Sequence, residues 1–312
     1  MKKMSATNQK ENQHLHSKIL ELKEKLKAVI LAHNYQVPEI QEVADYLGDS
    51  LELAKISRNL KEDVIVFCGV RFMAETAKIL SPEKKVLLPF PDAGCPLADT
   101  ITSEELLSLK KENPDSWVVS YVNTSAEIKA LSDVCCTSSN AVKVVRNIPA
   151  DKVIFVPDKN LGDWVKKNVP HKKVVTWRGF CYVHEQFSGE DLKKVRRIYP
   201  NAVVMVHPEC PSSVQDAADF VVSTSGMLKE AKRSSSNEFI IGTEEGLIYR
   251  LKKENPQKEF YSLGASNICV DMKKITLNEL YEALSRGQYE ITLNEDIIEK
   301  AKKSLERMVE FV

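Results

Sequence analysis

The sequence predicts an α/β protein built from three pseudo-threefold-related α/β/α repeats, with short parallel sheets around a central cavity. Two sets of regularly spaced residues indicate the repeats. Cys95, Cys181 and Cys269 are separated by 86 and 88 residues. Three aspartates recur with spacings of 88 and 86 residues, namely Asp45, Asp133 and Asp219. Because equivalent residues occupy equivalent positions about a pseudo-threefold axis, we expect the three cysteines to converge in the middle of the molecule.

Short runs rich in Val and Ile alternate with helical patterns within each repeat, which is typical of parallel βαβ units. In the first repeat we expect strands at 28–32, 64–68 and 85–89, and helices at 38–47, 51–60 and 72–80. The strands expected in the other two repeats are 118–122, 153–157, 173–177, 203–207, 219–223 and 238–242. Amphipathic helices with hydroxyl N-caps are expected to begin at Ser103, Ser188 and Thr276.

The expected organisation is a polar N-terminal tail at 1–16, followed by repeats at 17–101, 102–187 and 188–275. Units of about 85–90 residues can fold around small cores when they share interfaces. A last helical segment, 276–312, has no strands after it. We expect this segment to pack back on the first repeat and so to close the assembly.

Composition excludes several classes of partner. The chain has 44 basic and 44 acidic residues and no basic tract interleaved with aromatic residues, so we expect no nucleic-acid partner. No apolar run approaches the roughly 18 residues that span a bilayer, and no signal peptide is visible, so we expect a cytoplasmic protein without a membrane partner. The seven dispersed cysteines agree with a reducing compartment. The glycine-rich motifs of dinucleotide-binding proteins and P-loop NTPases are absent.

A hydroxyl side chain comes five residues after each repeated aspartate, at Ser50, Ser138 and Thr224. These residues lie at expected helix starts beyond the carboxyl ends of strands, where ligands of parallel sheets bind. Unpaired backbone N–H groups and the helix dipole favour anions at such positions. The hydroxyls could instead serve only as helix caps, and the sequence leaves both interpretations open.

Four of the cysteines are interpreted mainly as packing residues. Cys68 ends the strand expected at 64–68, and Cys135 and Cys136 are interpreted as lying in a further strand of the second repeat. A lone cysteine in a strand acts as a small hydrophobic residue. Cys210 follows a strand, so an approach to the site stays open, although packing is favoured.

The remaining cysteines, Cys95, Cys181 and Cys269, each lie in a loop after the last strand of a repeat. Three thiolates brought together suit an iron–sulfur cluster or zinc. Three protein ligands leave one metal position open, and an open iron can act as a Lewis acid in dehydration chemistry.

Histidines and neighbouring polar residues supply candidates for proton transfer. His33 and His207 follow strands, and His184 comes three residues after Cys181. Each could be a structural histidine, but together with Tyr35, Tyr121 and Glu209 they form a set suited to acid–base chemistry near neutral pH. The other histidines, His14, His16 and His171, are expected at the surface.

Eight segments carry a resemblance to a known family: HNYQVPEIQEVADYLGDSLELA, VIVFCGVRFMAETAKIL, SYVNTSAEIKALSD, PDKNLGDWV, GFCYVHEQF, VHPEC, STSGM and CVDMKKITL. They extend from about residue 28 to about residue 280 and together resemble the quinolinate synthase A family of the three-cysteine type. The resemblance implies a [4Fe–4S] cluster held by Cys95, Cys181 and Cys269. It also implies condensation of iminoaspartate with dihydroxyacetone phosphate to quinolinate, with loss of phosphate and two waters, in de novo NAD biosynthesis. The partner it suggests is an L-aspartate oxidase as the source of iminoaspartate.

Matching positions also imply the pocket residues. The catalytic candidates are Tyr35, Tyr121, His184, His207 and Glu209. The substrate-binding candidates are His33, Ser50, Tyr121, Asn123, Ser138, His207, Glu209 and Thr224. Met272 stands where some family members carry the second cysteine of a CxxC motif, so a disulfide switch is not expected at that site.

Two other functions stay open at this point. A non-catalytic iron–sulfur sensor of oxygen or iron could use the same thiolates, although the repeats leave no room for a DNA-binding output module. A zinc-dependent hydro-lyase or aldolase could be built on the same fold, because thiolates bind both metals.

Overall fold

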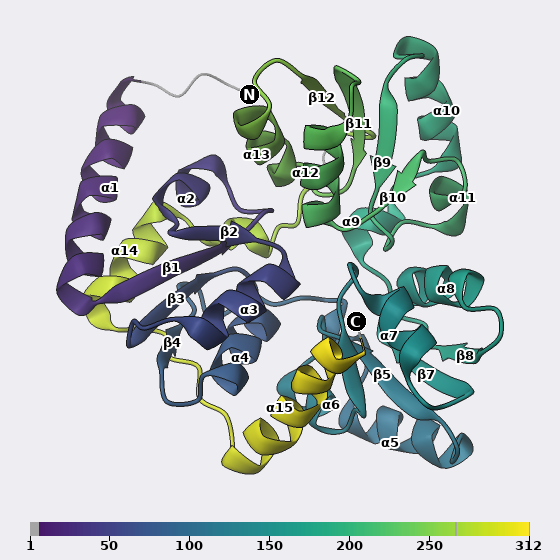
Figure 1. The fold of residues 1–312 in the computed structure, drawn as a ribbon. Coiled ribbons are helices and arrows are strands. Elements are labelled where there is room, and N and C mark those ends of the chain that lie inside the picture. Colours follow the sequence, from purple (N-terminus) through teal and green to yellow (C-terminus); the bar gives the residue numbers. More distant parts are fainter. Residues whose placement is uncertain (1–5, 266, 312) are drawn as a thin grey trace. The chain divides into compact units, whose positions relative to one another are not determined.

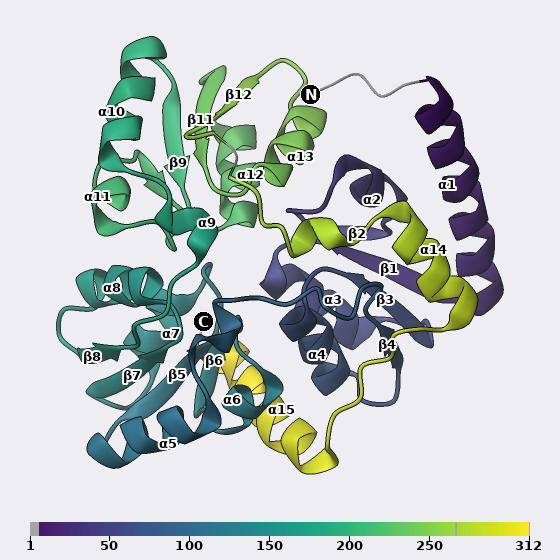
Figure 2. The same cartoon turned by 180° about the vertical axis from the view of Figure 1, so that it is seen from behind.

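The computed structural model describes residues 6–265 and 267–311, which fold into two compact units (Figures 1 and 2). The first unit comprises the chain up to Gly94 together with Val270–Leu293. The second comprises Cys95–Cys269 together with the segment that begins at Asn294. Within the described ranges, no helix has the length and the apolar character needed to cross a membrane.

The first unit contains one parallel sheet with the strand order β2-β1-β3-β4. Its strands are β1 (Ala28–His33), β2 (Tyr46–Gly48), β3 (Val64–Cys68) and β4 (Lys85–Leu87). Its helices are α1 (Ala6–Leu26), α2 (Pro38–Val43), α3 (Ser50–Asn59), α4 (Arg71–Leu80) and α14 (Leu277–Arg286), with a 3₁₀ turn at Met272–Lys274. Strand β1 is buried throughout, as expected for a central strand of a parallel sheet covered on both faces.

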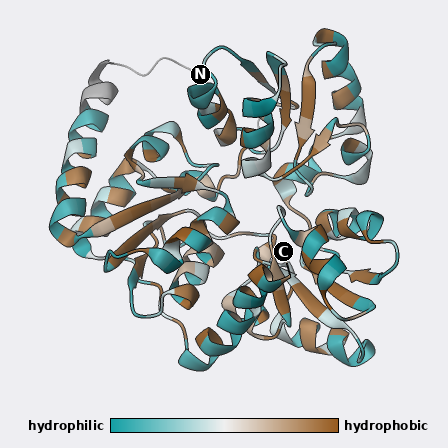
Figure 3. Cartoon of the chain, in the orientation of Figure 1, coloured by the Kyte–Doolittle hydropathy of each residue, from teal (hydrophilic) through white to brown (hydrophobic). Residues whose placement is uncertain are grey.

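The second unit contains two further parallel sheets of the same design, with the orders β6-β5-β7-β8 and β10-β9-β11-β12. The strands of the first are β5 (Trp117–Tyr121), β6 (Val134–Cys136), β7 (Lys152–Val156) and β8 (Lys173–Thr176). Those of the other are β9 (Val203–Val206), β10 (Phe220–Val221), β11 (Glu238–Gly242) and β12 (Glu259–Ser262). Figure 3 shows that the strands are mostly hydrophobic, whereas the helices around them carry hydrophilic residues as well. The predicted α/β fold with three short parallel sheets is therefore confirmed.

Helices and one 3₁₀ turn connect these strands. The first sheet of this unit is joined by a 3₁₀ turn (Ala98–Thr100), α5 (Ser103–Glu112), α6 (Ala126–Ala130), α7 (Ala141–Asn147) and α8 (Lys159–Asn168). The other sheet is joined by α9 (Tyr182–Glu185), α10 (Gly189–Ile198), α11 (Ser212–Gln215), α12 (Thr224–Arg233) and α13 (Gly246–Glu254). The last helix, α15 (Glu295–Glu310), belongs to this unit as well.

The repeated aspartates have a structural role. Each carboxylate accepts a hydrogen bond from a backbone N–H of the first strand of its sheet, at Ile30, Val118 or Val204, over 2.8, 2.7 and 2.7 Å. The backbone N–H of each aspartate donates in return to the carbonyl of the same strand residue. This two-way bond fixes the segment that enters the second strand, so Asp45, Asp133 and Asp219 organise the sheets.

The two chain ends differ from expectation. Residues 6–16, expected as a polar tail, form the first part of α1, while residues 1–5 lie outside the described residues. The segment 276–312 divides: α14 packs against α1 and β3 of the first unit, but α15 packs against α6 and β6 of the second unit (Figures 1 and 2). The expectation that all of 276–312 packs on the first repeat is therefore wrong for 295–310. The reason is the buried face of α15, formed by Ala301, Ser304, Leu305 and Met308.

Several short elements also differ from expectation. The helix expected at 38–47 ends at Val43, and Tyr46–Gly48 forms edge strand β2. The strand expected at 219–223 shortens to Phe220–Val221. Ser188 caps α10 as expected, whereas α5 is capped by Thr102 rather than Ser103, through a capping box with Glu105.

Replacing Leu305 in α15 by Ala tests the docking of this helix. Leu305 is buried in the second unit, so the cavity should lower the free energy of unfolding by about 2–5 kcal/mol. Val309→Ala, on the exposed side of the same helix, should change it by less than about 0.5 kcal/mol. Denaturant titration of the two variants measures both values, and equal midpoints would contradict the packing described here.

Candidate functional site

The side chains of the second unit that were expected to act together follow the carboxyl ends of parallel strands. Tyr121 is the last residue of β5, His207 follows β9, and Glu209 comes two residues later. His184 lies in the short helix α9, which begins just after Cys181. Parallel strands bring these ends to one edge of a sheet, which is where ligands bind in such folds.

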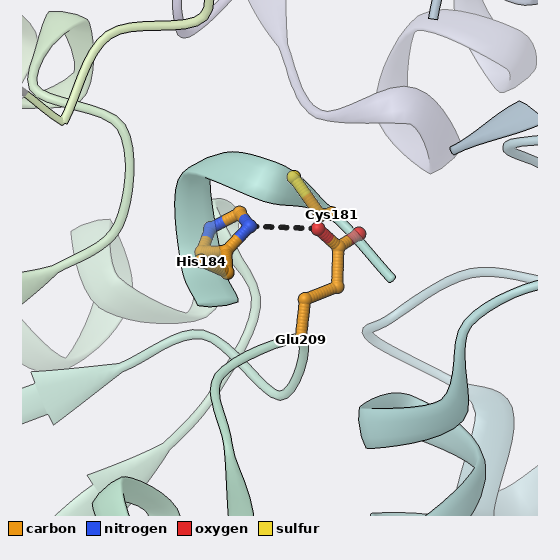
Figure 4. Close-up of side chains that lie close together, drawn as sticks. All are labelled: Cys181, His184 and Glu209. Carbon is orange, nitrogen blue, oxygen red and sulfur yellow. Dashed lines mark ion pairs between the residues drawn. The ribbon is translucent and has the colours of Figure 1, made fainter. Parts of the chain in front are cut away.

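Glu209 is the centre of a buried hydrogen-bond network. The Tyr121 hydroxyl donates to Glu209 Oε1 over 2.6 Å, and His184 Nδ1 lies 2.8 Å from Glu209 Oε2. The side chains of His184 and Glu209 are 2 % and 4 % exposed. Figure 4 shows the imidazole of His184 and the carboxylate of Glu209 turned toward each other beside the sulfur of Cys181. The ligand atoms of Cys181, His184 and Glu209 all lie within 4.8 Å of one another.

These contacts set the ionisation of Glu209. Burial alone would raise its pKa, but the attraction of His184 and His207 and hydrogen bonds from His184 and Tyr121 lower the pKa to about 2. Glu209 is therefore a carboxylate at neutral pH and can stabilise a neighbouring cation and orient the groups that are hydrogen-bonded to it.

His207 is held in the neutral form. Its burial lowers its pKa to about 3, against the attraction of Glu209. The backbone N–H of Glu209 donates to His207 Nδ1 over 3.3 Å, so the ring proton is assigned to Nε2, which lies 3.2 Å from the Ser138 hydroxyl. The ring stacks on that of His184 with 4.7 Å between centroids. A neutral imidazole with a fixed tautomer can donate from Nε2 toward a ligand beside Ser138.

Cys95, Cys181 and Cys269 each lie in a loop after the last strand of a sheet, and each is partly exposed. Burial of the sulfur raises the pKa of Cys95, and repulsion from Cys269 and Glu209 adds to this. The pKa of Cys181 is raised by burial and by Glu209, with a further contribution from Cys95. The charge of Cys95 therefore interacts with those of both Cys181 and Cys269. Loss of their protons needs a compensating cation, and a metal group fits this donor set.

Two buried carboxylates hold the backbone of these cysteine loops. Asp158 Oδ2 accepts from the backbone N–H of Cys181 over 3.2 Å, and Glu244 Oε1 accepts from that of Cys269 over the same distance. Burial, followed by repulsion from Glu209, raises the pKa of Asp158. Each carboxylate also accepts from the start of the following helix, at Leu161 N and Gly246 N, and so ties the cysteine loop to that helix.

Comparison with known proteins gives the family. The model of the family described as quinolinate synthetase A protein matches residues 17–310. A protein of Caldicellulosiruptor bescii named quinolinate synthase is 54 % identical over 95 % of this chain and 98 % of its own. Proteins of the same name from Thermodesulfovibrio yellowstonii and Methanoregula boonei are 53 % and 50 % identical, over 94 % and 95 % of this chain and 97 % of their own. The chain belongs to the quinolinate synthase family of enzymes.

The quinolinate synthase site residues expected in the first unit lie on neighbouring strand ends. His33 ends β1 and its ring meets that of Tyr35 edge-on at 4.5 Å between centroids. The backbone N–H of Tyr35 donates to His33 Nδ1 over 3.2 Å, which repeats the bond between Glu209 and His207. Ser50 follows β2, which pairs with β1 in parallel, so Ser50 lies at the same edge of the sheet.

The cap interpretation of the repeated hydroxyls is wrong for two of them. The side chain of Asp49 caps α3, and that of Ser223 caps α12, so Ser50 and Thr224 are the first residues inside their helices. Ser138 precedes α7, whose N-cap position is Asn140. The hydroxyls of Ser50 and Thr224 are thus not used as the helix caps.

Asn123, in the turn after β5, has a buried side-chain oxygen, Oδ1, for which the described residues supply no hydrogen-bond partner. A buried carbonyl oxygen of this kind is costly unless a ligand or water bonds to it. Its position therefore agrees with a substrate-binding role.

The cysteines interpreted as packing residues are buried. Cys68, Cys135 and Cys136 lie inside β3 and β6 with no exposed surface. Cys210 lies in an apolar cluster with Val204 and Ile240, and its thiol contacts the Gly242 carbonyl at 3.4 Å. The packing interpretation is confirmed for these four residues.

Reasoning from sequence missed several polar residues at the site. Thr243 Oγ1 lies 2.8 Å from His184 Nε2, and the Asn160 amide donates to the carbonyl of Glu209 over 2.9 Å. Asp158 and Glu244 were missed as well. Thr243 and Glu244 follow β11 directly, Asp158 comes two residues after β7, and Asn160 lies in the first turn of α8. Asp158 and Glu244 are 86 residues apart, so the strand-end rule combined with the repeat could have found them.

The depressed pKa of His207 predicts a dependence of stability on pH. The unfolded chain takes up a proton near the usual pKa of 6.5, whereas folded His207 stays neutral until its pKa of about 3. The free energy of unfolding therefore decreases as the pH falls below the pKa of this histidine in the unfolded chain. The loss from this one group is about 2 kcal/mol between pH 7 and pH 5. Denaturant titrations of the metal-free chain and of His207→Gln measure this difference, because the variant lacks the titrating ring. If the free energy of unfolding falls equally in the two proteins between pH 7 and pH 5, His207 does not have the lowered pKa described here.

Proposed function

We propose that this chain condenses iminoaspartate with dihydroxyacetone phosphate to form quinolinate, phosphate and two waters, as a step of de novo NAD biosynthesis. The reaction balances without an oxidant or reductant. It needs removal of protons from carbon, protonation of leaving oxygens and binding of several anionic groups. Membership of the quinolinate synthase family supports this proposal.

The observation that carries the proposal is the buried network of Tyr121, His184 and Glu209 beside the thiol of Cys181. A buried carboxylate that stays ionised at neutral pH can orient the Tyr121 hydroxyl and the His184 ring and stabilise positive charge on a neighbouring group that takes up a proton. The Tyr121 hydroxyl, bonded to that carboxylate, can relay a proton to or from substrate. We assign proton transfer during isomerisation and dehydration to this network, together with Tyr35 of the first unit and neutral His207.

We assign Cys95, Cys181 and Cys269 as ligands of a [4Fe–4S] cluster. Such a cluster with three protein ligands supplies an open iron that acts as a Lewis acid toward substrate oxygen. A single zinc ion on these three cysteines is disfavoured for a geometric reason. A single zinc ion needs thiolate sulfurs about 3.8 Å apart, from Zn–S bonds of about 2.3 Å in a tetrahedron. In the described part of the chain the three cysteines are not among the side-chain groups close enough to share one ion, whereas Cys181, His184 and Glu209 are.

The carboxylates and the phosphate of the substrates require hydrogen-bond donors in the site, and not only positive charge. Ser50 and Thr224 stand in the first turn of α3 and α12, where backbone N–H groups and the helix dipole favour carboxylate or phosphate. We assign anion binding to these hydroxyls and to Ser138, with His33 and Asn123 as further substrate contacts.

Iminoaspartate is unstable in water, so its supply is part of the proposal. An L-aspartate oxidase is the class of enzyme that would supply it, and we expect both to act in the cytoplasm. A non-catalytic iron–sulfur sensor is the alternative from another class. It gives no reason for the buried Tyr121–Glu209–His184 network, since a sensor transfers no protons to a substrate.

Metal analysis tests the ligand assignment. Anaerobically purified protein should contain about four iron and four acid-labile sulfide per chain. Cys95→Ser should lose the cluster, whereas Cys210→Ser, at a buried cysteine of the core, should retain it. Zinc in place of iron, or equal iron in the two variants, would refute the cluster assignment.

Phenylalanine substitutions test the tyrosine hydroxyls. Tyr35→Phe and Tyr121→Phe should each lower quinolinate formation by about 100-fold or more, because a general acid–base group contributes on that scale. Their iron content and visible spectrum should match the unmodified protein. Tyr46→Phe, at a tyrosine that is 43 % exposed, is the matched control and should leave turnover unchanged. Full turnover in either site variant would remove that hydroxyl from the mechanism.

A further inference from the structure

A second set of repeated residues lies just behind the turns that carry the site. Gln41, Lys129 and Gln215 are spaced by 88 and 86 residues, the same spacings as the repeated aspartates. All three are long polar side chains, and all are buried, with exposed fractions of 3 %, 0 % and 4 %. Buried polar side chains of this length are costly unless their donors are used, so their hydrogen bonds indicate their role.

In the third repeat, the Gln215 amide is a donor to the turn that carries His207 and Glu209. Its Nε2 lies 2.7 Å from the Cys210 carbonyl and 2.9 Å from the Pro208 carbonyl. A longer contact of 3.3 Å reaches the carbonyl of Asn160. The turn is closed by a hydrogen bond from Cys210 N to the His207 carbonyl over 3.0 Å.

The first repeat has the same arrangement in the other unit. Gln41 Nε2 donates to the Gln36 carbonyl over 2.8 Å and to the Asn34 carbonyl over 3.2 Å. The turn is again closed by a hydrogen bond, from Gln36 N to the His33 carbonyl. The second and fourth carbonyls of the turn are therefore held in both repeats.

The second repeat uses a lysine for the same contact. Lys129 Nζ donates to the carbonyl of Thr124, which is the fourth residue of the turn that begins at Tyr121. The Thr124 hydroxyl closes this turn by donating to the Tyr121 carbonyl over 3.0 Å. In each repeat the donor side chain thus reaches a carbonyl five residues before it.

In each turn the side chains and the backbone carbonyls have different partners. The side chains at the first and third positions are the expected site residues His33, Tyr35, Tyr121, Asn123, His207 and Glu209. The carbonyl at the fourth position, and in two repeats also the second, points to the buried donor. A rotation of the turn would therefore move the site side chains and break the donor contacts together.

We propose that Gln41, Lys129 and Gln215 are positioning residues that clamp the three site-bearing turns and so set the orientation of the acid–base side chains. They touch no reacting atom themselves. A purely structural role, in which the donors only satisfy buried carbonyls, predicts a loss of stability without an effect on the turns or on turnover. The two roles can be separated by experiment, and the turnover measurement rests on the proposed function.

Hydrogen exchange of the loaded protein tests the clamp without reference to activity. Gln215→Met and Lys129→Met remove the donors while keeping much of the apolar volume. Each should raise amide exchange about tenfold in the peptide spanning its own turn, 205–211 or 119–125, with other peptides unchanged. Each should also lower kcat about tenfold or more with KM changed less than threefold, because misplaced catalytic groups act on the chemical step.

The chain itself offers two matched controls. Lys129→Gln introduces the residue that the other two repeats use across a turn of the same length, so it should restore exchange protection and kcat to within about threefold of the unmodified protein. Asp133→Asn and Asp219→Asn weaken partly buried contacts to the backbone of the same two sheets, away from the turns. These two variants should lower thermal stability but leave turn exchange and kcat unchanged.

The outcomes are decisive in both directions. Unchanged exchange at the turns of Gln215→Met and Lys129→Met, or effects no larger than those of the aspartate controls, would overturn the clamp. A Lys129→Gln variant as impaired as Lys129→Met would overturn it for the second repeat. If the unmodified protein forms no quinolinate, the proposed function fails, and the clamp is then decided by exchange alone. If Lys129→Met does not fold, Gln215→Met and Lys129→Gln carry the same test.

Discussion

The buried negative charge of Glu209 is the constraint on which the candidate site depends. A carboxylate with 4 % of its side chain exposed is stable only when its oxygens are hydrogen-bonded or paired. Tyr121 from the turn after β5 bonds one oxygen, and His184 from α9 pairs with the other. Because these partners come from separate segments of the second unit, the one charge fixes how the segments meet. The low pKa of Glu209 results from that arrangement, because its neighbours stabilise the charged form.

The same charge couples the proton network to the cysteines. Glu209 raises the pKa of both Cys95 and Cys181, so the carboxylate opposes formation of the thiolates that a metal group requires. A bound cationic group reverses this balance, since it stabilises the thiolates and the carboxylate together. Metal binding at such a site releases protons from the thiols and is therefore dependent on pH. Binding of the proposed cluster and the ionisation of the proposed acid–base residues are for this reason electrostatically coupled.

Sequence reasoning was sufficient where a periodic pattern carried the information. The repeat spacing and the Val- and Ile-rich runs predicted three parallel sheets, and loops after the last strands predicted where Cys95, Cys181 and Cys269 lie. It failed where two or three residues decide the structure, as in β2 and β10, or where adjacent residues compete for one role. Asp49 and Ser223 cap their helices because each can bond back to the first turn, which leaves Ser50 and Thr224 one position inside. The docking of α15 was missed because an amphipathic face shows that a helix packs, but not on which neighbour.

The triplicated design separates chemistry from architecture by position within the repeat. The first and third residues of the turn are His and Tyr in the first repeat, Tyr and Asn in the second, and His and Glu in the third. Eight residues after the start of each turn comes a buried donor side chain, and twelve residues after it comes an aspartate. The buried donor and the aspartate bond to backbone groups of the turn and of the first strand, and every sequence possesses such groups. The side chains of the first and third turn residues are therefore not needed to hold the fold, so they can differ from one repeat to the next. Three copies of one supersecondary unit can in this way present three distinct sets of side chains at their strand ends, without any change in how the unit folds.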